Sequence, residues 1–289
     1  MLVTAVIPAF NAERFVAEAI ESVLGQTHRA VECIVVDDGS TDRTAKVVER
    51  YGERVRLVRQ RNAGVSAARN NGAAACSGSF IAFLDADDRW HPAKLEQQLA
   101  ALRSATAQTM AVCAVRAIDE AGGPLGERTW HCPSGLLHGL VMFDGARTIS
   151  CSSTSLIPRT LFESIGGFER QLSMSADLDL LIRIARRGEV VIMNEPLADY
   201  RVHVGSMSRD VALMERDMLL VFERLFRGHD ALQWSARERR RAYANLHRML
   251  AGSYLKAGEP GRFLRHAAAS ARRDPRALAY FLRVRRSGA

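Results

Sequence analysis

Short clusters of aspartates are the residues whose types and spacing could support chemistry. Asp37 and Asp38 are adjacent and precede a Gly-Ser-Thr-Asp stretch, and Asp85, Asp87 and Asp88 form a second cluster. Carboxylate oxygens are hard ligands that suit Mg²⁺ or Mn²⁺, and such ions usually also hold substrate phosphates. Like charges in a small space are costly unless a cation joins them. The two clusters therefore predict a divalent cation, provided that the fold brings them together.

The strands that precede these two clusters are expected to bring them together. Helical patterns alternate with apolar runs of strand length, which cover residues 4–8, 32–36, 55–59 and 80–84. This alternation predicts an α/β fold, in which a mostly parallel sheet carries helices on both faces. Ligands of open α/β sheets bind outside the carboxyl ends of the strands, where both aspartate clusters fall.

Each cluster alone has a purely structural interpretation. Residues 37–42 are a good turn followed by a helix N-cap, and Asp85 with Asp87 could be a solvated turn. Their joint occurrence at the ends of successive strands favours a binding site.

From about residue 105 the alternation of strand and helix patterns becomes less regular. Strands are expected at 110–118, 149–157 and 190–193, with a helix that ends at Gly188. Beyond Ser206 the chain is expected to be helical, with helices at 236–256, 260–272 and 275–284. We expect a catalytic domain at 1–205, with a first half at 1–104 and a second at 105–205, and a basic amphipathic helical region at 206–289.

Composition and charge narrow the class of protein. The chain has 289 residues, is 47% hydrophobic and carries a net charge of +8. Its five cysteines form no CxxC pair, and neither a secretory leader nor an apolar run long enough to span a membrane is evident. We therefore expect a cytoplasmic protein, at most peripheral at the inner face of the membrane. Residues 236–289 alone have a net charge of +11, which leaves −3 for the rest.

Four segments resemble the GT-A glycosyltransferases, and more narrowly glycosyltransferase family 2. They read VIPAFN at 6–11, VVDDGSTD at 35–42, NAG to RN at 62–70 and FLDADD at 83–88. The resemblance extends to about residue 205. It implies an inverting enzyme that transfers a sugar from a nucleoside-diphosphate donor with Mn²⁺ or Mg²⁺, as in the synthesis of cell-surface polysaccharides or glycoconjugates.

The resemblance also implies roles for single residues on the donor side. Asp38 would hold the base, uracil, with Arg69 nearby, and Asp85 would bind ribose or share the metal. Asp87 would ligate the metal between the diphosphate oxygens. The residues placed against the nucleotide would be Pro8, Ala9 and Phe10.

On the acceptor side, the family usually reads Glu-Asp-x-Asp where this chain reads Ala176 to Asp179. The resemblance implies that Asp177 is the general base. With Ala176 in place of the usual Glu, this chain has one acceptor-side carboxylate fewer than the family motif. The alternative is that Asp177 is only a helix N-cap. His203 would complete the metal or diphosphate contacts, although a lone histidine is more often structural, and residues 205–208 would form a lid.

Other functions stay open from the sequence. An acidic pair at a strand end with a third aspartate also describes a Mg²⁺-dependent phospho-acceptor signalling domain, or a nucleotide-binding protein without glycosyl transfer. The Gln-x-x-Arg-Trp motif of processive family members is absent, which favours the transfer of one sugar. The acceptor would be a carbohydrate or a lipid-linked molecule.

The basic region has several interpretations. Its arginines could form solvated helix faces, dock on the catalytic body, contact an anionic membrane or form a homodimer through the C-terminal helices. No nucleic-acid reading module is recognisable, so we expect no nucleic-acid partner.

Overall fold

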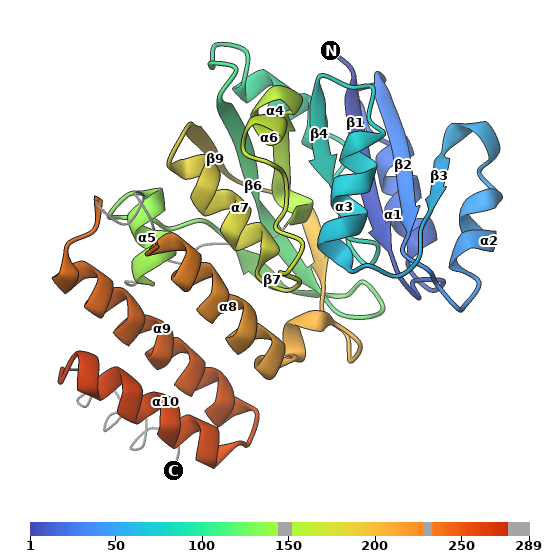
Figure 1. Cartoon of the computed structure of the whole chain (residues 1–289). Helices are drawn as coiled ribbons and strands as arrows, with labels where there is room; N and C mark the ends of the chain where they lie inside the picture. The colour runs from blue at the N-terminus through green and yellow to red at the C-terminus, as the bar shows by residue number, and fades with distance from the viewer. Residues whose placement is uncertain (144–151, 228–232, 277–289) are drawn as a thin grey trace. The chain divides into compact units, whose positions relative to one another are not determined.

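The computed structural model describes residues 1–143, 152–227 and 233–276 (Figure 1). The chain divides into two compact units, of which unit 1 holds Met1–His131 with Thr148–Ser206. Unit 2 holds Cys132–Arg147 with Met207–Ala289.

One mixed β-sheet forms the centre of unit 1. Its strands run in the order β3-β2-β1-β4-β8-β6-β9-β5, and β7 pairs with β6. The strands are β1 (Val3–Ala9), β2 (Val31–Asp37), β3 (Arg56–Arg59), β4 (Phe80–Phe83), β5 (Arg89–Trp90), β6 (Thr109–Ile118), β7 (Pro124–Arg128), β8 (Ser155–Pro158) and β9 (Glu189–Arg201).

The first four strands are parallel to one another, as their alternation with helices predicted. All seven residues of β1 are buried, because helices cover both faces of this part of the sheet. Helix α1 (Val16–Leu24) packs with the side of β1 that carries Ala5 and Ile7. Helix α3 (Val65–Ala74) lies on the other face, where a Cβ on Gly72 would meet a methyl carbon of Val6 at 2.3 Å (Figure 1). Glycine at this position therefore lets α3 approach the sheet closely.

The remaining strands add antiparallel pairs to the parallel part, so that the sheet is mixed. Strand β8 is antiparallel to both β4 and β6, and β9 is parallel to β6. Strands β7 and β8 pair with the same edge of β6 at different positions. The reason is that the strand–helix alternation ends after β4, so that hairpin-like pairing becomes available.

Each predicted strand and helix of unit 1 has a counterpart within the described residues, and one prediction was partly wrong. Of the predicted strand at 149–157, the described part is a 3₁₀ turn, η2 (Ser152–Thr154), followed by β8. The other helices of unit 1 are α2 (Thr44–Glu49), η1 (Gly52–Arg54), α4 (Lys94–Ala101), α6 (Arg159–Ser164) and α7 (Ala176–Ala185).

Unit 2 is helical within the described residues. Its elements are α5 (Leu136–Met142), η3 (Met207–Arg209), α8 (Val211–Leu225), α9 (Ala236–Lys256) and α10 (Pro260–Arg273). Helix α9 begins at a capping box, in which Ser235 and Glu238 bond each other's backbone N–H groups. Both predicted helices at 236–256 and 260–272 are confirmed, while most of the one at 275–284 lies outside the described residues. Within the described part of the chain, no helix has the length and apolar character that a membrane span requires.

Candidate functional site

The carboxyl ends of β1 and β2 are tied together by Asn11. Its backbone adopts a left-handed conformation, with φ of 49°. The side-chain Oδ1 accepts a hydrogen bond from the backbone N–H of Thr41 at 2.9 Å, and the backbone N–H of Asn11 donates to Ser40. Of the three residues predicted against the nucleotide, Pro8 and Ala9 are buried at the end of β1, and Phe10 is half exposed. An aromatic face is therefore available at this strand end.

Asp38 follows β2 and is buried, with both carboxylate oxygens in use. One oxygen accepts from the side chain of Gln60 at 2.7 Å and from the backbone N–H of Ala63 at 2.8 Å. The other accepts from the backbone N–H of Gly64 at 2.9 Å. Asp38 thus holds the loop that enters α3.

Arg69 and Asp85 form an ion pair in which Arg69 is buried and Asp85 is partly exposed. Arg69 projects from α3, and its Nη2 donates to Oδ1 of Asp85, which follows β4, at 2.6 Å. The guanidinium also lies 5.1 Å from the ring centroid of Phe168. The structure therefore brings together two of the predicted donor-side residues, from elements 16 positions apart in the sequence.

Asp87 and His203 are also in contact. Nε2 of His203 lies 3.0 Å from Oδ2 of Asp87, and the two residues are 116 positions apart. Burial and the nearby carboxylate of Asp85 raise the pKa of Asp87, and His203 opposes this shift. The imidazole packs against Phe15, with ring centroids 5.0 Å apart. His203 is thus oriented from two sides.

Asp88 is held by Ser153, a residue that the sequence did not single out. The Ser153 hydroxyl donates to Oδ2 of Asp88 at 2.6 Å and accepts from the backbone N–H of Asp85 at 3.1 Å. Burial and the carboxylates of Asp87 and Asp85 raise the pKa of Asp88 well above its ordinary value. Ser153 therefore fixes the turn that carries the second aspartate cluster.

Asp177 lies in the first turn of α7, two residues after the N-cap residue Ser175. Burial, the largest cause, raises the pKa of Asp177 to about 7; Asp85 adds to the shift and Arg69 opposes it. The residue lines a small pocket whose other lining residues are Met110, Val112, Trp130, Ser152, Thr154, Ser155, Phe168, Leu180 and Leu181. A carboxylate with a pKa near 7 can both accept and release a proton at neutral pH.

The neighbours of Asp177 on α7 point elsewhere. Asp179 forms an ion pair with Arg183 at 2.7 Å, four residues later on the same helix. Ala176 is fully buried, and the position that carries Glu in the resembled motif has no carboxylate here.

The residues present fit a cation site that a substrate would complete. Among the described residues, no three histidine, cysteine or acidic side chains form a group that could hold a metal ion. Asp87 and His203 are in contact, whereas Asp85 is engaged with Arg69. Mg²⁺ is commonly bound by one or two protein ligands together with substrate phosphates, and imidazole is also a ligand for transition metals. Asp87 and His203 are therefore the residues that would hold a divalent cation.

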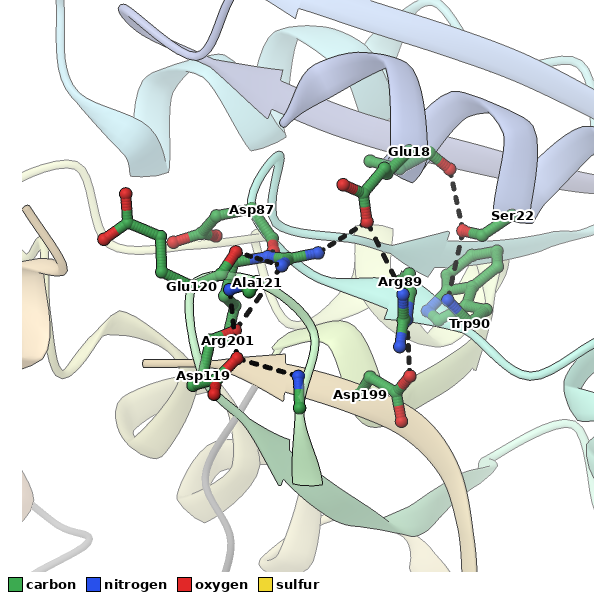
Figure 2. Close-up of polar contacts among 12 residues, drawn as sticks. Glu18, Ser22, Asp87, Arg89, Trp90, Asp119, Glu120, Ala121, Asp199 and Arg201 are labelled. Atoms are coloured by element: carbon green, nitrogen blue, oxygen red, sulfur yellow. Dashed lines mark hydrogen bonds and ion pairs between the residues drawn. The ribbon is translucent and has the colours of Figure 1, made fainter. Parts of the chain in front are cut away.

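Arg201, at the end of β9, is a second residue that the sequence reasoning missed. Its side chain is 1% exposed and it bonds Glu18, Asp87 and the turn after β6 (Figure 2). The available signal was an arginine two residues before His203 in the sequence.

Comparisons with known proteins show what this chain is similar to. The sequence model of Glycosyl transferase family 2 matches residues 4–166. An uncharacterised glycosyltransferase of Rickettsia typhi is 32% identical over 213 residues, which cover 70% of this chain and 64% of that protein. The chain thus spans less than two thirds of that relative's length.

A second relative has a more specific name. TuaG of Bacillus subtilis, a glycosyltransferase named for teichuronic acid biosynthesis, is 30% identical over 234 residues, or 79% of this chain and 90% of that protein. Among solved structures, residues 1–349 of S. aureus TarS in complex with UDP-GlcNAc match with a TM-score of 0.66 and 16% identity. That match covers 95% of this chain and 92% of the TarS chain, and it confirms the GT-A fold.

Proposed function

Because this chain belongs to glycosyltransferase family 2, we propose that it transfers one sugar from a UDP-sugar to an acceptor hydroxyl, with inversion at the anomeric carbon and with a divalent cation. Family membership leaves the alternative of a phospho-acceptor signalling domain without support.

One observation carries this proposal. Arg69 forms an ion pair with Asp85, on the donor side, and its charge also acts to lower the pKa of Asp177, on the acceptor side. A candidate base is thereby within electrostatic reach of the residues proposed to hold the donor. A single displacement requires this arrangement, because the acceptor hydroxyl must lie close to both the base and the anomeric carbon.

The proposed reaction needs one proton acceptor and one stabilised leaving group. Asp177 takes the proton of the acceptor hydroxyl while the hydroxyl oxygen forms a bond to the anomeric carbon. The bond from that carbon to the diphosphate oxygen breaks, and the electron pair leaves with UDP. A cation held by Asp87 and His203, either Mn²⁺ or Mg²⁺, supplies charge stabilisation for the diphosphate.

The donor side is assigned to the strand ends of the parallel half of the sheet. Asp38 and the loop that it holds receive the base, Pro8, Ala9 and Phe10 line the nucleotide, and Asp85 with Arg69 lies toward the ribose. The structure of TarS with UDP-GlcNAc supports a uridine nucleotide. We assign donor binding to residues 1–104 and acceptor binding to 105–205.

The acceptor is proposed to be a growing cell-surface polysaccharide or a lipid-linked precursor of one. The name of TuaG, which refers to teichuronic acid biosynthesis, supports this class. Transfer is expected in the cytoplasm, at the inner face of the membrane.

Residues 206–289 are proposed to contact an anionic membrane. Arg237, Arg240, Arg262, Arg265 and Arg272 are exposed on α9 and α10. The test is co-sedimentation with vesicles that contain phosphatidylglycerol; binding that is lost at high salt is expected, and no binding at low salt would refute this contact. A homodimer through these helices would instead appear as a doubled mass in light scattering without lipid.

The transferase proposal is tested by nucleotide binding and donor hydrolysis. We expect UDP, rather than GDP or dTDP, to raise the melting temperature in the presence of Mn²⁺, because a bound ligand stabilises the folded state. Slow release of UDP from UDP-sugars should require Mn²⁺ or Mg²⁺ and should be abolished by Asp87→Ala. Failure of all UDP-, GDP- and dTDP-sugars to bind would refute the proposal.

A further inference from the structure

Arg201 bonds Asp87 and contacts the same phenylalanine ring as His203. We propose that Arg201 is the positioning residue that holds Asp87 and His203 in the orientation needed to bind a divalent cation. This inference rests on the proposed function, because it concerns the metal and diphosphate end of the donor site. Arg201 is buried, so it acts through the residues that it orients and not by touching the donor.

The guanidinium joins three separate segments of unit 1. Its Nε donates to the backbone carbonyl of Asp87 at 2.8 Å, and Nη1 donates to the carbonyl of Glu120, in the turn after β6, also at 2.8 Å. Nη2 donates to the carboxylate of Glu18, on α1, at 2.6 Å. Figure 2 shows Arg201 between Glu18 on one side and Asp87 with the 119–121 turn on the other. One planar group thus fixes the distances between these segments.

The backbone of Arg201 also contacts the segment that carries Asp87 and Asp88. Its N–H donates to Oδ1 of Asp88 at 2.9 Å. Asp88 and the carbonyl of Asp87 are therefore both bonded by one residue, which fixes the backbone on either side of the Asp87 side chain. A displacement of Arg201 would move Asp87 directly.

The contact with His203 runs through Phe15. The Arg201 guanidinium lies 5.0 Å from the centroid of the Phe15 ring, and the His203 ring lies 5.0 Å from the same ring. Because Arg201 and His203 are two residues apart at the end of an extended strand, both can reach this ring. The ring therefore couples the orientation of the imidazole to that of the guanidinium.

The energetic cost of the arrangement favours a specific role. Burying a guanidinium is costly, and a well-packed apolar side chain would often stabilise a fold as well or better. Here the guanidinium donors reach the main-chain carbonyls of Asp87 and Glu120 and the carboxylate of Glu18. Residues that orient metal ligands in this way typically change metal affinity by about 10–100-fold when they are replaced.

The test compares Arg201→Met and Arg201→Lys with the wild-type protein and with Arg116→Met. Arg116, on β6, bonds Asp199 in the same charged region, and it serves as the matched control. Calorimetry measures UDP binding across a series of Mn²⁺ concentrations, and electron paramagnetic resonance measures free Mn²⁺ directly. Glu18→Gln, at a half-exposed position, weakens the same contact if the Arg201 variants fold poorly.

We expect the Mn²⁺ concentration for half-maximal UDP binding to rise about 10–100-fold in both Arg201 variants. UDP affinity at saturating Mn²⁺ should be nearly unchanged, the shift in Glu18→Gln should be smaller, and Arg116→Met should match the wild type. A merely structural role would lower the melting temperature without moving the Mn²⁺ midpoint, and that result would overturn the inference while the proposed function stands. If the wild-type protein binds no UDP at any Mn²⁺ concentration, the proposed function fails and the inference fails with it.

Discussion

Replacing Asp177 with asparagine should stabilise the protein while it removes transfer activity. The pKa of Asp177 is raised from 3.8 to about 7 because the carboxyl is buried, so the folded state holds a proton that the unfolded state releases between these values. Stability is therefore lost as the pH rises from about 4 to about 7. Since one pKa unit corresponds to about 1.4 kcal/mol, the ionised carboxylate costs about 4 kcal/mol at pH 8.

Asparagine has no charge to bury, so the gain in free energy of unfolding from Asp177→Asn should grow with pH. We expect it to increase by about 2–3 kcal/mol between pH 5 and pH 8. Urea unfolding measures this difference, followed by tryptophan fluorescence, to which Trp130 in the same pocket contributes. A difference that does not change with pH would refute the assignment of the shifted pKa to Asp177.

Activity should change in the opposite sense. In the wild-type protein, transfer should rise about tenfold from pH 6 to pH 8 as Asp177 ionises, and Asp177→Asn should lose about 10²–10⁴-fold while UDP binding is retained. Asp179→Asn is the matched control: the same chemical change two residues away should keep transfer and should lower stability, because the ion pair with Arg183 is lost. Full transfer by Asp177→Asn would exclude it as the base.

Three further predictions concern other parts of the molecule. Asp38→Ala should weaken UDP binding about tenfold or more in calorimetry, because Ala63 and Gly64 lose the acceptor that holds their loop; unchanged affinity would mean that the loop is held without it. Ser153→Ala should lower the free energy of unfolding by about 1–3 kcal/mol, since a buried oxygen of Asp88 loses its donor; a loss no larger than that of an exposed Ser→Ala change would contradict this. Burial lowers the pKa of His247 from 6.5 to about 4, so proton uptake on unfolding should cost about 2 kcal/mol of stability as the pH falls from 7 to 5. Asp177 contributes in the opposite sense over this pH range, so the loss is measured as a difference between His247→Gln and the wild type. Thermal unfolding followed by the helical circular dichroism signal should show the wild type losing stability relative to His247→Gln as the pH falls from 7 to 5.

Local signals in the sequence predicted most of the elements. The continuous apolar run of β1 and the small-residue helix α3 follow from burial on both sides, and the ends of α9 follow from the Ser235–Glu238 cap and from Gly258. These features depend on neighbouring residues in the sequence, which is why periodicity and capping rules can predict them.

The contacts within the site could be predicted less completely. The aspartate clusters could be placed at one sheet edge, but the partner of each carboxylate depends on long-range packing. Asp85 could be read as a metal ligand, whereas the position of α3 gives it Arg69 as a partner. Ser153 and Arg201 could not be identified because their contacts depend on how β8 and β9 pair with β6. The regular alternation of strands and helices ends before these strands, so the sequence pattern does not predict how they pair.

The path of the chain between the two units limits where the protein can be truncated. The chain passes between unit 1 and unit 2 after His131, after Arg147 and after Ser206, so unit 2 is not a simple C-terminal extension. Helix α5 lies between β7 and β8 in the sequence, yet its Leu140, Val141 and Met142 are buried and Asn245 of α9 bonds the carbonyl of Met142. Truncation at residue 206 would therefore expose the apolar side of α5 and create an aggregation-prone fragment. The catalytic contribution of the helical unit therefore has to be measured with point substitutions in the intact chain.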